Sequence, residues 1–410
     1  MSDVRIDDPP RVSFGWMALL ALAQMGVIMA ATVGGQILLP SQVAAIDPVT
    51  KEASLAVVLA VAAVCTAVAN PLFGAMSDRT SSRFGRRRPW IVGGALLSAG
   101  ALAFLAFQDT IAGLVAGWAV AQLAFTAALA TAIATVPDQV PILQRGTASA
   151  LAGVGQLSGP LLGGVVATVL LTGSRPAFLA MAVLVLVLIL PFGLFTREPD
   201  TEPCPPFSLR DFARGFWVSP RRHPDFAWAW LSRLMITLTL AMGIGYLQYF
   251  LRDAVHYPTE SVEQGVVVLV AVFTLGSVAP TLLAGWLSDR TGRRRPAVFL
   301  GGLTMAASAL VLTAATTWGA AIAAAALLGA GYGMFAAVDQ AMVTQLLPAD
   351  ADRGKDLGIV SLSNSASNTL GPVIAAPLVT SAGGYPLMYG VAAAFAVTGA
   401  CLVWRIRGVR

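Results

Sequence analysis

Residues 74–90, GAMSDRTSSRFGRRRPW, decide the fold, because they place one aspartate and five arginines between two long apolar runs. A shorter version, GWLSDRTGRRRP, returns at residues 285–296. The first glycines of the two versions are 211 positions apart, and Pro137 and Pro348 have the same separation. A constant offset across half of a chain indicates an internal repeat. We infer that the chain is a duplicated unit.

The composition around these loops is that of a membrane protein. The chain has 410 residues, of which 57% are hydrophobic and 11% are charged, whereas soluble domains carry roughly 25% charged residues. Apolar runs recur from Trp16 to Trp404, and most are long enough to cross a bilayer core of roughly 30 Å as helices. The sequence therefore predicts an all-α polytopic membrane protein.

Charged residues, prolines and glycines divide the apolar sequence into twelve predicted transmembrane helices. We expect a six-helix bundle over 1–195, a proline-containing central loop over 196–225 and a second six-helix bundle over 226–410. The predicted spans are about 14–45, 54–76, 90–107, 111–136, 147–171, 176–195, 226–251, 262–287, 297–315, 318–347, 357–381 and 385–404.

The distribution of basic residues predicts the orientation. With both termini in the cytosol, the arginines of both repeated loops and of the central loop are cytosolic, and only Lys51, Arg175 and Arg252 lie outside. This arrangement obeys the positive-inside rule and predicts a multi-pass protein of the cytoplasmic (inner) membrane. The use of 24 arginines against two lysines is typical of a GC-rich genome, and we expect a bacterial source.

Several classes of function are disfavoured. The basic excess of +5 is explained by topology, so we expect no nucleic-acid partner. Cys65, Cys204 and Cys401 are scattered and indicate neither a disulfide framework nor a metal site. No phosphate-binding loop follows a strand. We expect no cofactor, an ion gradient as the source of energy, and a monomer in the lipid bilayer.

The repeated loops resemble the loop motif of the major facilitator superfamily. The residues that carry this resemblance are Gly74, Asp78, Arg79, Gly85, Arg86, Arg87 and Arg88 in the first copy and Gly285, Asp289, Arg290, Gly292, Arg293, Arg294 and Arg295 in the second. Ion pairs in these loops hold helix ends together in one conformation and break in another, so we expect them to act as gates. Gly74 and Gly85 are expected to permit close packing of the flanking helices.

The resemblance implies two parallel-repeat six-helix bundles that bind substrate midway between them. In that fold helices 1, 4, 7 and 10 line the cavity, so their polar residues become candidate substrate contacts. Asn364 and Asn368 on helix 11 could serve in the cavity or between helices. The candidates on the lining helices are Gln24, Gln36, Gln122, Thr126, Gln248, Tyr249 and Gln340.

Asp339 is the only acidic residue well inside a predicted span, about 12 Å from its cytosolic end at the helical rise of 1.5 Å per residue. Arg233 lies about 10 Å deep in helix 7 by the same measure. Charges at such depth are costly and usually functional. We expect a buried ion pair in which Asp339 carries a coupled proton. The alternatives are a static brace between helices 7 and 10, or an Arg233 side chain that reaches the interface.

Helix 5 carries Gly155, Gly159 and Gly163 on one face, which predicts close helix packing. This spacing resembles the antiporter motif of drug exporters, but Trp118 stands in helix 4 where those exporters carry an arginine. The longer first loop resembles the sucrose-type and glycoside–cation symporter branches instead.

We therefore expect a secondary transporter that takes up a sugar or glycoside with protons. Proton-driven efflux of amphipathic compounds is the alternative, followed by a uniporter or a non-transporting sensor. The chain lacks the clustered acids, histidines or cysteines that an intramembrane enzyme needs at one depth.

Overall fold

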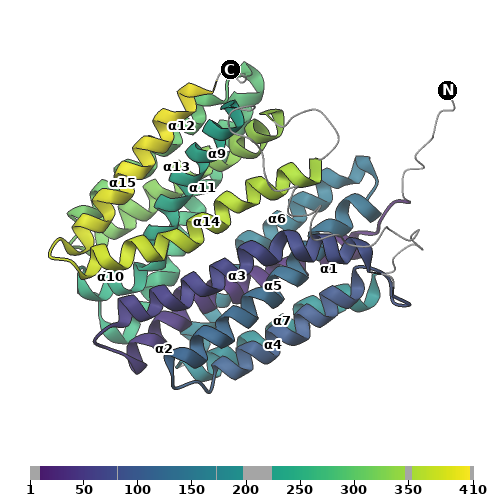
Figure 1. Cartoon of the computed structure of the whole chain (residues 1–410), viewed down its shortest axis with the longest axis horizontal. Coiled ribbons are helices and arrows are strands. Elements are labelled where there is room, and N and C mark those ends of the chain that lie inside the picture. The colour runs from purple at the N-terminus through teal and green to yellow at the C-terminus, as the bar shows by residue number, and fades with distance from the viewer. Residues whose placement is uncertain (1–9, 81, 172, 197–223, 347–352, 407–410) are drawn as a thin grey trace. The chain divides into compact units, whose positions relative to one another are not determined.

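The computed structural model describes residues 10–80, 82–171, 173–196, 224–346 and 353–406. These residues are helical almost throughout and include no strand (Figure 1). The helices are α1 (Phe14–Val33), α2 (Leu39–Ile46), α3 (Lys51–Arg79), α4 (Arg88–Leu105), α5 (Ile111–Gln139), α6 (Ile142–Val165), α7 (Ser174–Phe195), α9 (Pro224–Gly245), α10 (Leu247–Asp253), α11 (Val262–Thr291), α12 (Arg295–Thr313), α13 (Trp318–Leu346), α14 (Arg353–Thr380) and α15 (Gly384–Leu402).

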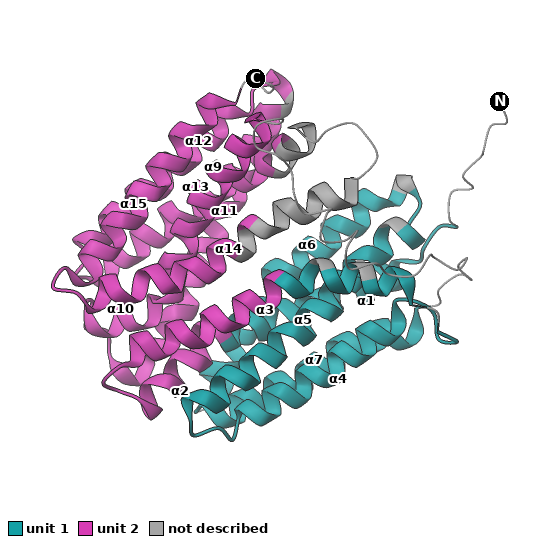
Figure 2. Ribbon diagram, in the orientation of Figure 1, with its two compact units in different colours: residues 1–34, 68–207 teal, residues 35–67, 208–410 magenta. Residues whose placement is uncertain are grey.

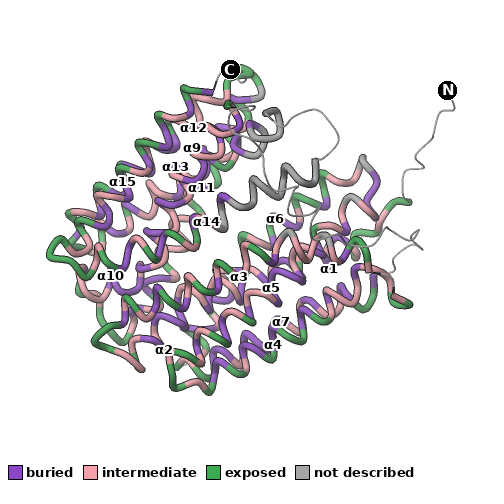
Figure 3. Tube along the Cα trace, in the orientation of Figure 1, coloured by how far each residue is buried: buried purple, intermediate pink, exposed green. Residues whose placement is uncertain are grey.

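The predicted class, an all-α polytopic membrane protein, is confirmed. Within the described part of the chain, eleven helical segments are long and apolar enough to cross a bilayer. A twelfth long helix, α14, contains several serines and asparagines and is less apolar. Buried and exposed positions alternate along the helices (Figure 3). Many exposed positions hold large apolar side chains, among them Leu170, Leu275 and Leu282, as expected for helices surrounded by lipid.

Two predicted spans are interrupted in the structure. The span predicted over 14–45 consists of α1, a π-helical turn (Gly34–Leu38) and α2. The span predicted over 226–251 is divided at Tyr246 into α9 and α10. Hydropathy alone does not detect such interruptions, because the residues on both sides of them are equally apolar.

The ends of several helices follow from local sequence. The Ser13 and Thr110 side chains accept hydrogen bonds from the backbone N–H groups of Trp16 and Gly113, at 3.2 and 3.1 Å, and so cap α1 and α5. Gly292 has a left-handed backbone conformation (φ +64°) that ends α11, where glycine avoids the penalty of a Cβ atom. The prolines in the first turns of α4 and α12 are suited to that position.

The α1–α6 contact depends on small residues. A Cβ atom at Gly159 would lie 2.8 Å from the carbonyl oxygen of Met25 on α1. Gly155 and Gly163 also lie against α1, at Ala21 and at Met29 and Val33. The predicted packing role of this glycine face is therefore confirmed.

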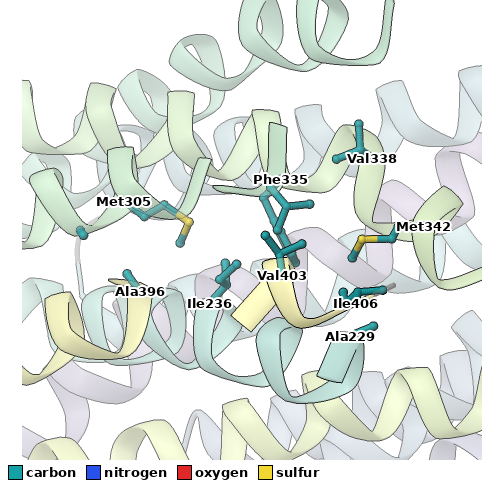
Figure 4. Packing of buried hydrophobic residues seen from close by; sticks show 11 residues of the cluster. Ala229, Ile236, Met305, Phe335, Val338, Met342, Ala396, Val403 and Ile406 are labelled. Carbon is teal, nitrogen blue, oxygen red and sulfur yellow. The ribbon is translucent and has the colours of Figure 1, made fainter. Parts of the chain in front are cut away.

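The contact between α9, α12, α13 and α15 has an apolar core. It includes Ile236 from α9, Met305 from α12, Phe335 from α13 and Ala396 from α15, all nearly inaccessible to solvent (Figure 4). Hydroxyl groups add hydrogen bonds between these helices: Ser232 donates to the carbonyl of Gly399 at 2.6 Å. Packing and interhelical hydrogen bonds of this kind hold membrane helices together when both sides are equally apolar.

Contacts group the chain into two compact units, residues 1–34 with 68–207 and residues 35–67 with 208–410 (Figure 2). This grouping follows the packing of one conformation, whereas the predicted division into bundles at 195 and 226 follows the internal repeat. That division stays a prediction. Most of the predicted central loop, 197–223, lies outside the described residues.

Substitution of Gly159 by alanine tests the α1–α6 packing. The added methyl group would meet the Met25 carbonyl, so the melting temperature in detergent is expected to fall by several degrees. Gly153→Ala on the same helix is the matched control, because a Cβ there meets no atom within 4 Å. Alanine is also the better helix former by up to about 1 kcal/mol, so Gly153→Ala should leave the melting temperature unchanged or raise it. Equal shifts for both variants would contradict the packing role.

Candidate functional site

Arg233 on α9 and Asp339 on α13 form a buried ion pair. Arg233 Nη1 donates a hydrogen bond to Asp339 Oδ2, and the two side chains are 10% and 5% exposed. Asp339 Oδ1 and Arg233 Nε are also buried, and among the described residues neither has a hydrogen-bond partner. Partly bonded charges in an apolar interior are energetically costly, which makes this pair the leading candidate for the functional centre.

The surroundings of the pair are apolar on two helices and polar on a third. Residues of the apolar cluster adjoin both members in sequence, with Ile236 following Arg233 on α9 and Val338 preceding Asp339 on α13. One turn beyond Arg233, the Thr237 hydroxyl lies 2.6 Å from the Ser367 hydroxyl of α14. Apolar side chains thus lie near the pair on α9 and α13, and the two hydroxyl groups lie one turn beyond Arg233.

Arg87 is the centre of a second group, in the first repeated loop. Its guanidinium donates to the Asp138 carboxylate at 3.0 Å and to the Ser77 hydroxyl at 2.5 Å, and it also pairs with Asp78. Arg86 lies 2.6 Å from the same Asp138 carboxylate. The Arg87 side chain is only 5% exposed. It connects the ends of α3 and α5 to the start of α4.

The glycines of the two repeated loops have structural roles that differ from those predicted. The predicted packing role of Gly74 is wrong in this conformation, since a Cβ there would meet no atom within 4 Å, and the same holds for Gly285. Gly85 and Gly292 are required for another reason, because their φ angles of +97° and +64° are rarely adopted by other residues. A tight turn explains these two positions.

A third group of polar residues lies at the opposite ends of the helices. Lys51, at the start of α3, pairs with Asp253 at 2.6 Å, and Tyr385 donates to the same carboxylate at 3.1 Å. The Tyr246 hydroxyl donates to the Pro372 carbonyl at 3.1 Å. Nearby, hydrogen bonds from Thr50 and Ser54 lower the pKa of Asp47 from its ordinary value. These bonds connect the start of α3 to α10, α14 and α15.

The same end contains a pocket of about 270 Å³. Its wall includes a chain of hydrogen bonds in which Gln248 donates to Ser41 at 2.6 Å and Ser41 donates to Glu263. Tyr249 and Arg252 complete the polar part of the wall. Tyr249 also donates to the Pro40 carbonyl at 3.0 Å.

The other predicted cavity residues are distributed along several helices. Gln24 is buried and accepts a hydrogen bond from Gln156 on α6 at 2.5 Å. Thr126 is buried and donates within α5 to the Gln122 carbonyl at 2.7 Å. Gln36 is half-buried in the π-helical turn, and Asn368 is exposed.

The side chains of Gln340, Asn364 and Asp289 lie outside the described residues. Contact of any predicted cavity residue with substrate stays a prediction.

Trp118, the residue that replaces the exporter arginine, has a structural role here. It is 1% exposed, and its ring lies where a side chain at Gly34 would be, 2.7 Å from the position of a Cβ. The tryptophan therefore packs against the first residue of the π-helical turn.

Sequence reasoning missed several polar partners. The residues that contact side chains far away in sequence are Asp138, Asp253, Glu263 and Gln156. Lys51 carried a signal, because it is one of two lysines in an arginine-rich chain. Within the described residues there is no group of three or more histidine, cysteine or acidic side chains that could hold a metal ion.

The described residues thus form long apolar helices with a buried ion pair and with charged groups near helix ends. The sequence matches the family described as MFS/sugar transport protein over residues 47–404. The chain belongs to this family. It is a multi-pass secondary transporter of the major facilitator superfamily, and not an enzyme.

Structural comparison agrees with this family. A crystal structure of the nucleoside transporter NupG is similar with a TM-score of 0.74 and 14% sequence identity, over 95% of this chain and 99% of that chain. At this identity the likeness concerns the fold. No curated protein sequence matches the chain.

Replacement of Arg87 by glutamine tests the first loop. The change removes a buried guanidinium from two carboxylates, and breaking a buried pair costs about 3 kcal/mol. The melting temperature is expected to fall by several degrees. Arg83→Gln is the control, because Arg83 is an exposed arginine of the same loop that lies over the Phe84 ring. If both variants melt alike, Arg87 is not the centre of the loop.

A double-mutant cycle on Lys51→Gln and Asp253→Asn tests the opposite end. The two side chains are 9% and 30% exposed, so a coupling of about 1 kcal/mol is expected. The double variant should therefore melt at a higher temperature than the sum of the single effects predicts. Additive effects would show that the pair contributes no coupling. Glu260→Gln, at an exposed acid of the same end, is the control, and combined with Lys51→Gln it should give additive effects.

Proposed function

We propose that this transporter takes up a small polar solute, a sugar or a glycoside, together with protons. The observation that carries the proposal is the buried Arg233–Asp339 pair, in which one carboxylate oxygen and one guanidinium nitrogen have no hydrogen-bond partner among the described residues. A proton or a solute hydroxyl group would supply the missing bond. Asp339 is thus the proposed proton carrier.

Proton coupling follows from the chemistry of such a pair. The proton affinity of a buried carboxyl group depends on the distance to cations and on contact with water. A conformational change that lets water reach Asp339 and moves the Arg233 side chain away from it would change both. Asp339 alone could then bind a proton from one side of the membrane and release it to the other. Arg233 would pair with Asp339 whenever the carboxyl group is deprotonated.

The solute class is supported by the matching family, by the similar structure and by the available side chains. The matching family is described by sugar transport, and the structural neighbour is a transporter of nucleosides, which contain a sugar. Gln122, Gln24 and Thr126 offer amide and hydroxyl groups that suit a polyhydroxylated solute.

We further propose how the two charged ends act. The Arg87 group would close the end that the positive-inside rule places in the cytosol, and the Lys51–Asp253 group would close the outer end. Each group would break when its side opens, as expected for alternating conformations. The energy would come from the proton gradient, with no resident cofactor.

Replacement of Asp339 by asparagine tests the proposal in proteoliposomes. Wild-type protein under an inward pH gradient of one unit is expected to accumulate its solute up to about tenfold, because one pH unit corresponds to about 1.4 kcal/mol for each proton moved. Asp339→Asn should still exchange labelled for unlabelled solute but should not accumulate it. Asp109→Asn, an exposed aspartate between α4 and α5, is the control and should accumulate normally.

The same assay with hexoses, disaccharides, nucleosides and amphipathic cations tests the solute class. Accumulation of a sugar or nucleoside is expected. If only the amphipathic cations accumulate, and only when the pH gradient is reversed, the protein is an exporter and the proposed uptake is wrong. Full gradient-driven accumulation by Asp339→Asn would rule out the coupling role of Asp339.

A further inference from the structure

The groove between α11, α12 and α13 has a volume of about 440 Å³. Its wall is apolar along most of its length, where it includes Leu283, Leu287 and Leu300. At one end it becomes polar, at Ser288, Thr291 and Arg293. The groove thus has an apolar body and a cationic end, and the cationic end lies in the second copy of the repeated loop.

The apolar part of the groove faces outward. Leu283, Leu287 and Leu300 are 65%, 54% and 53% exposed. Exposed leucines on a membrane-spanning helix contact lipid chains. The groove is therefore open to the hydrocarbon region, where an acyl chain can enter it from the side.

The cationic end differs from the matching end of the first repeat. In the first loop, Arg86 and Arg87 share the Asp138 carboxylate. Among the described side chains, no carboxylate pairs with Arg293 or Arg294, and Nη1 of Arg294 is buried without a hydrogen-bond partner. The repeat offset that matches Pro137 to Pro348 places Ala349, followed by Asp350, at the position of Asp138, and both lie outside the described residues.

A second feature increases the positive potential at this end. The helix α12 begins at Arg295, so the positive end of its helix dipole lies here and attracts anions. Arg290 is also present on the last turn of α11, with its guanidinium 5.4 Å from the centre of the Trp286 ring. A cation over an exposed tryptophan is typical of the boundary between lipid chains and headgroups.

We propose that this groove binds an anionic phospholipid, with an acyl chain along Leu283, Leu287 and Leu300 and the phosphate group at Arg293. The phosphate group supplies a negative charge beside the exposed guanidinium of Arg293. The site is independent of the transported solute.

Native mass spectrometry of the detergent-purified protein tests the site. Phosphatidylglycerol and phosphatidylcholine with the same acyl chains are added, and the retained lipid is measured. Wild-type protein is expected to retain phosphatidylglycerol preferentially. Arg293→Gln should reduce that retention about fivefold, the effect of one basic residue at a membrane surface, and should leave phosphatidylcholine unchanged. Arg83→Gln, an exposed arginine of the first loop, is the control and should have no effect.

A second pair of variants tests the apolar part. Leu300→Trp fills the groove from its exposed rim and should reduce the retention of both lipids. Leu310→Trp, on the same helix and 56% exposed but outside the groove, should not. The proposal is overturned if Arg83→Gln and Arg293→Gln reduce retention equally, or if Leu300→Trp has no effect. It is also overturned if glycerol 3-phosphate raises the melting temperature as much as phosphatidylglycerol does, since the site would then bind free phosphate.

Discussion

A charge inside an apolar helical bundle requires a counter-charge, and this requirement organises the structure. Arg87, Arg233 and Lys51 are all at most one-tenth exposed, and each has a carboxylate partner on another helix. Removal of one partner would leave the other charge buried and unpaired, which is far more costly than the pair itself. Each group joins the helices that its partners lie on: Arg87 joins α3, α4 and α5, Arg233 joins α9 and α13, and Lys51 joins α3 and α10.

The contacts between helices are suited to an element that changes conformation. The α1–α6 contact is made by glycines, and the contact of α9 with α14 uses hydroxyl groups. Neither type depends on large interlocking side chains. The large apolar core around Phe335 and Met305 instead connects α9, α12, α13 and α15 as a more rigid body.

The amino-acid sequence was sufficient for the class, the internal repeat and the candidate pair Arg233 and Asp339. A charged residue in an apolar run is visible without structure, because its cost does not depend on which helix is its neighbour. The partners of Arg87 and Lys51 could not be predicted, since Asp138 and Asp253 lie near loops, where acids are common. The role of Gly74 was also misjudged, because a loop motif does not specify which conformation brings its glycine against another helix.

The π-helical turn at Gly34–Leu38 has a consequence for the whole first span. A π-turn accommodates one extra residue, so the residues after it are rotated by about 100° from the direction that an uninterrupted α-helix would give them. Pro40 and Ser41 reach Tyr249 and Gln248 only with that rotation. Loss of a single residue from this turn would keep Ser41, Gln248 and Tyr249 in the protein, yet would rotate the side chains of α2 away from their partners.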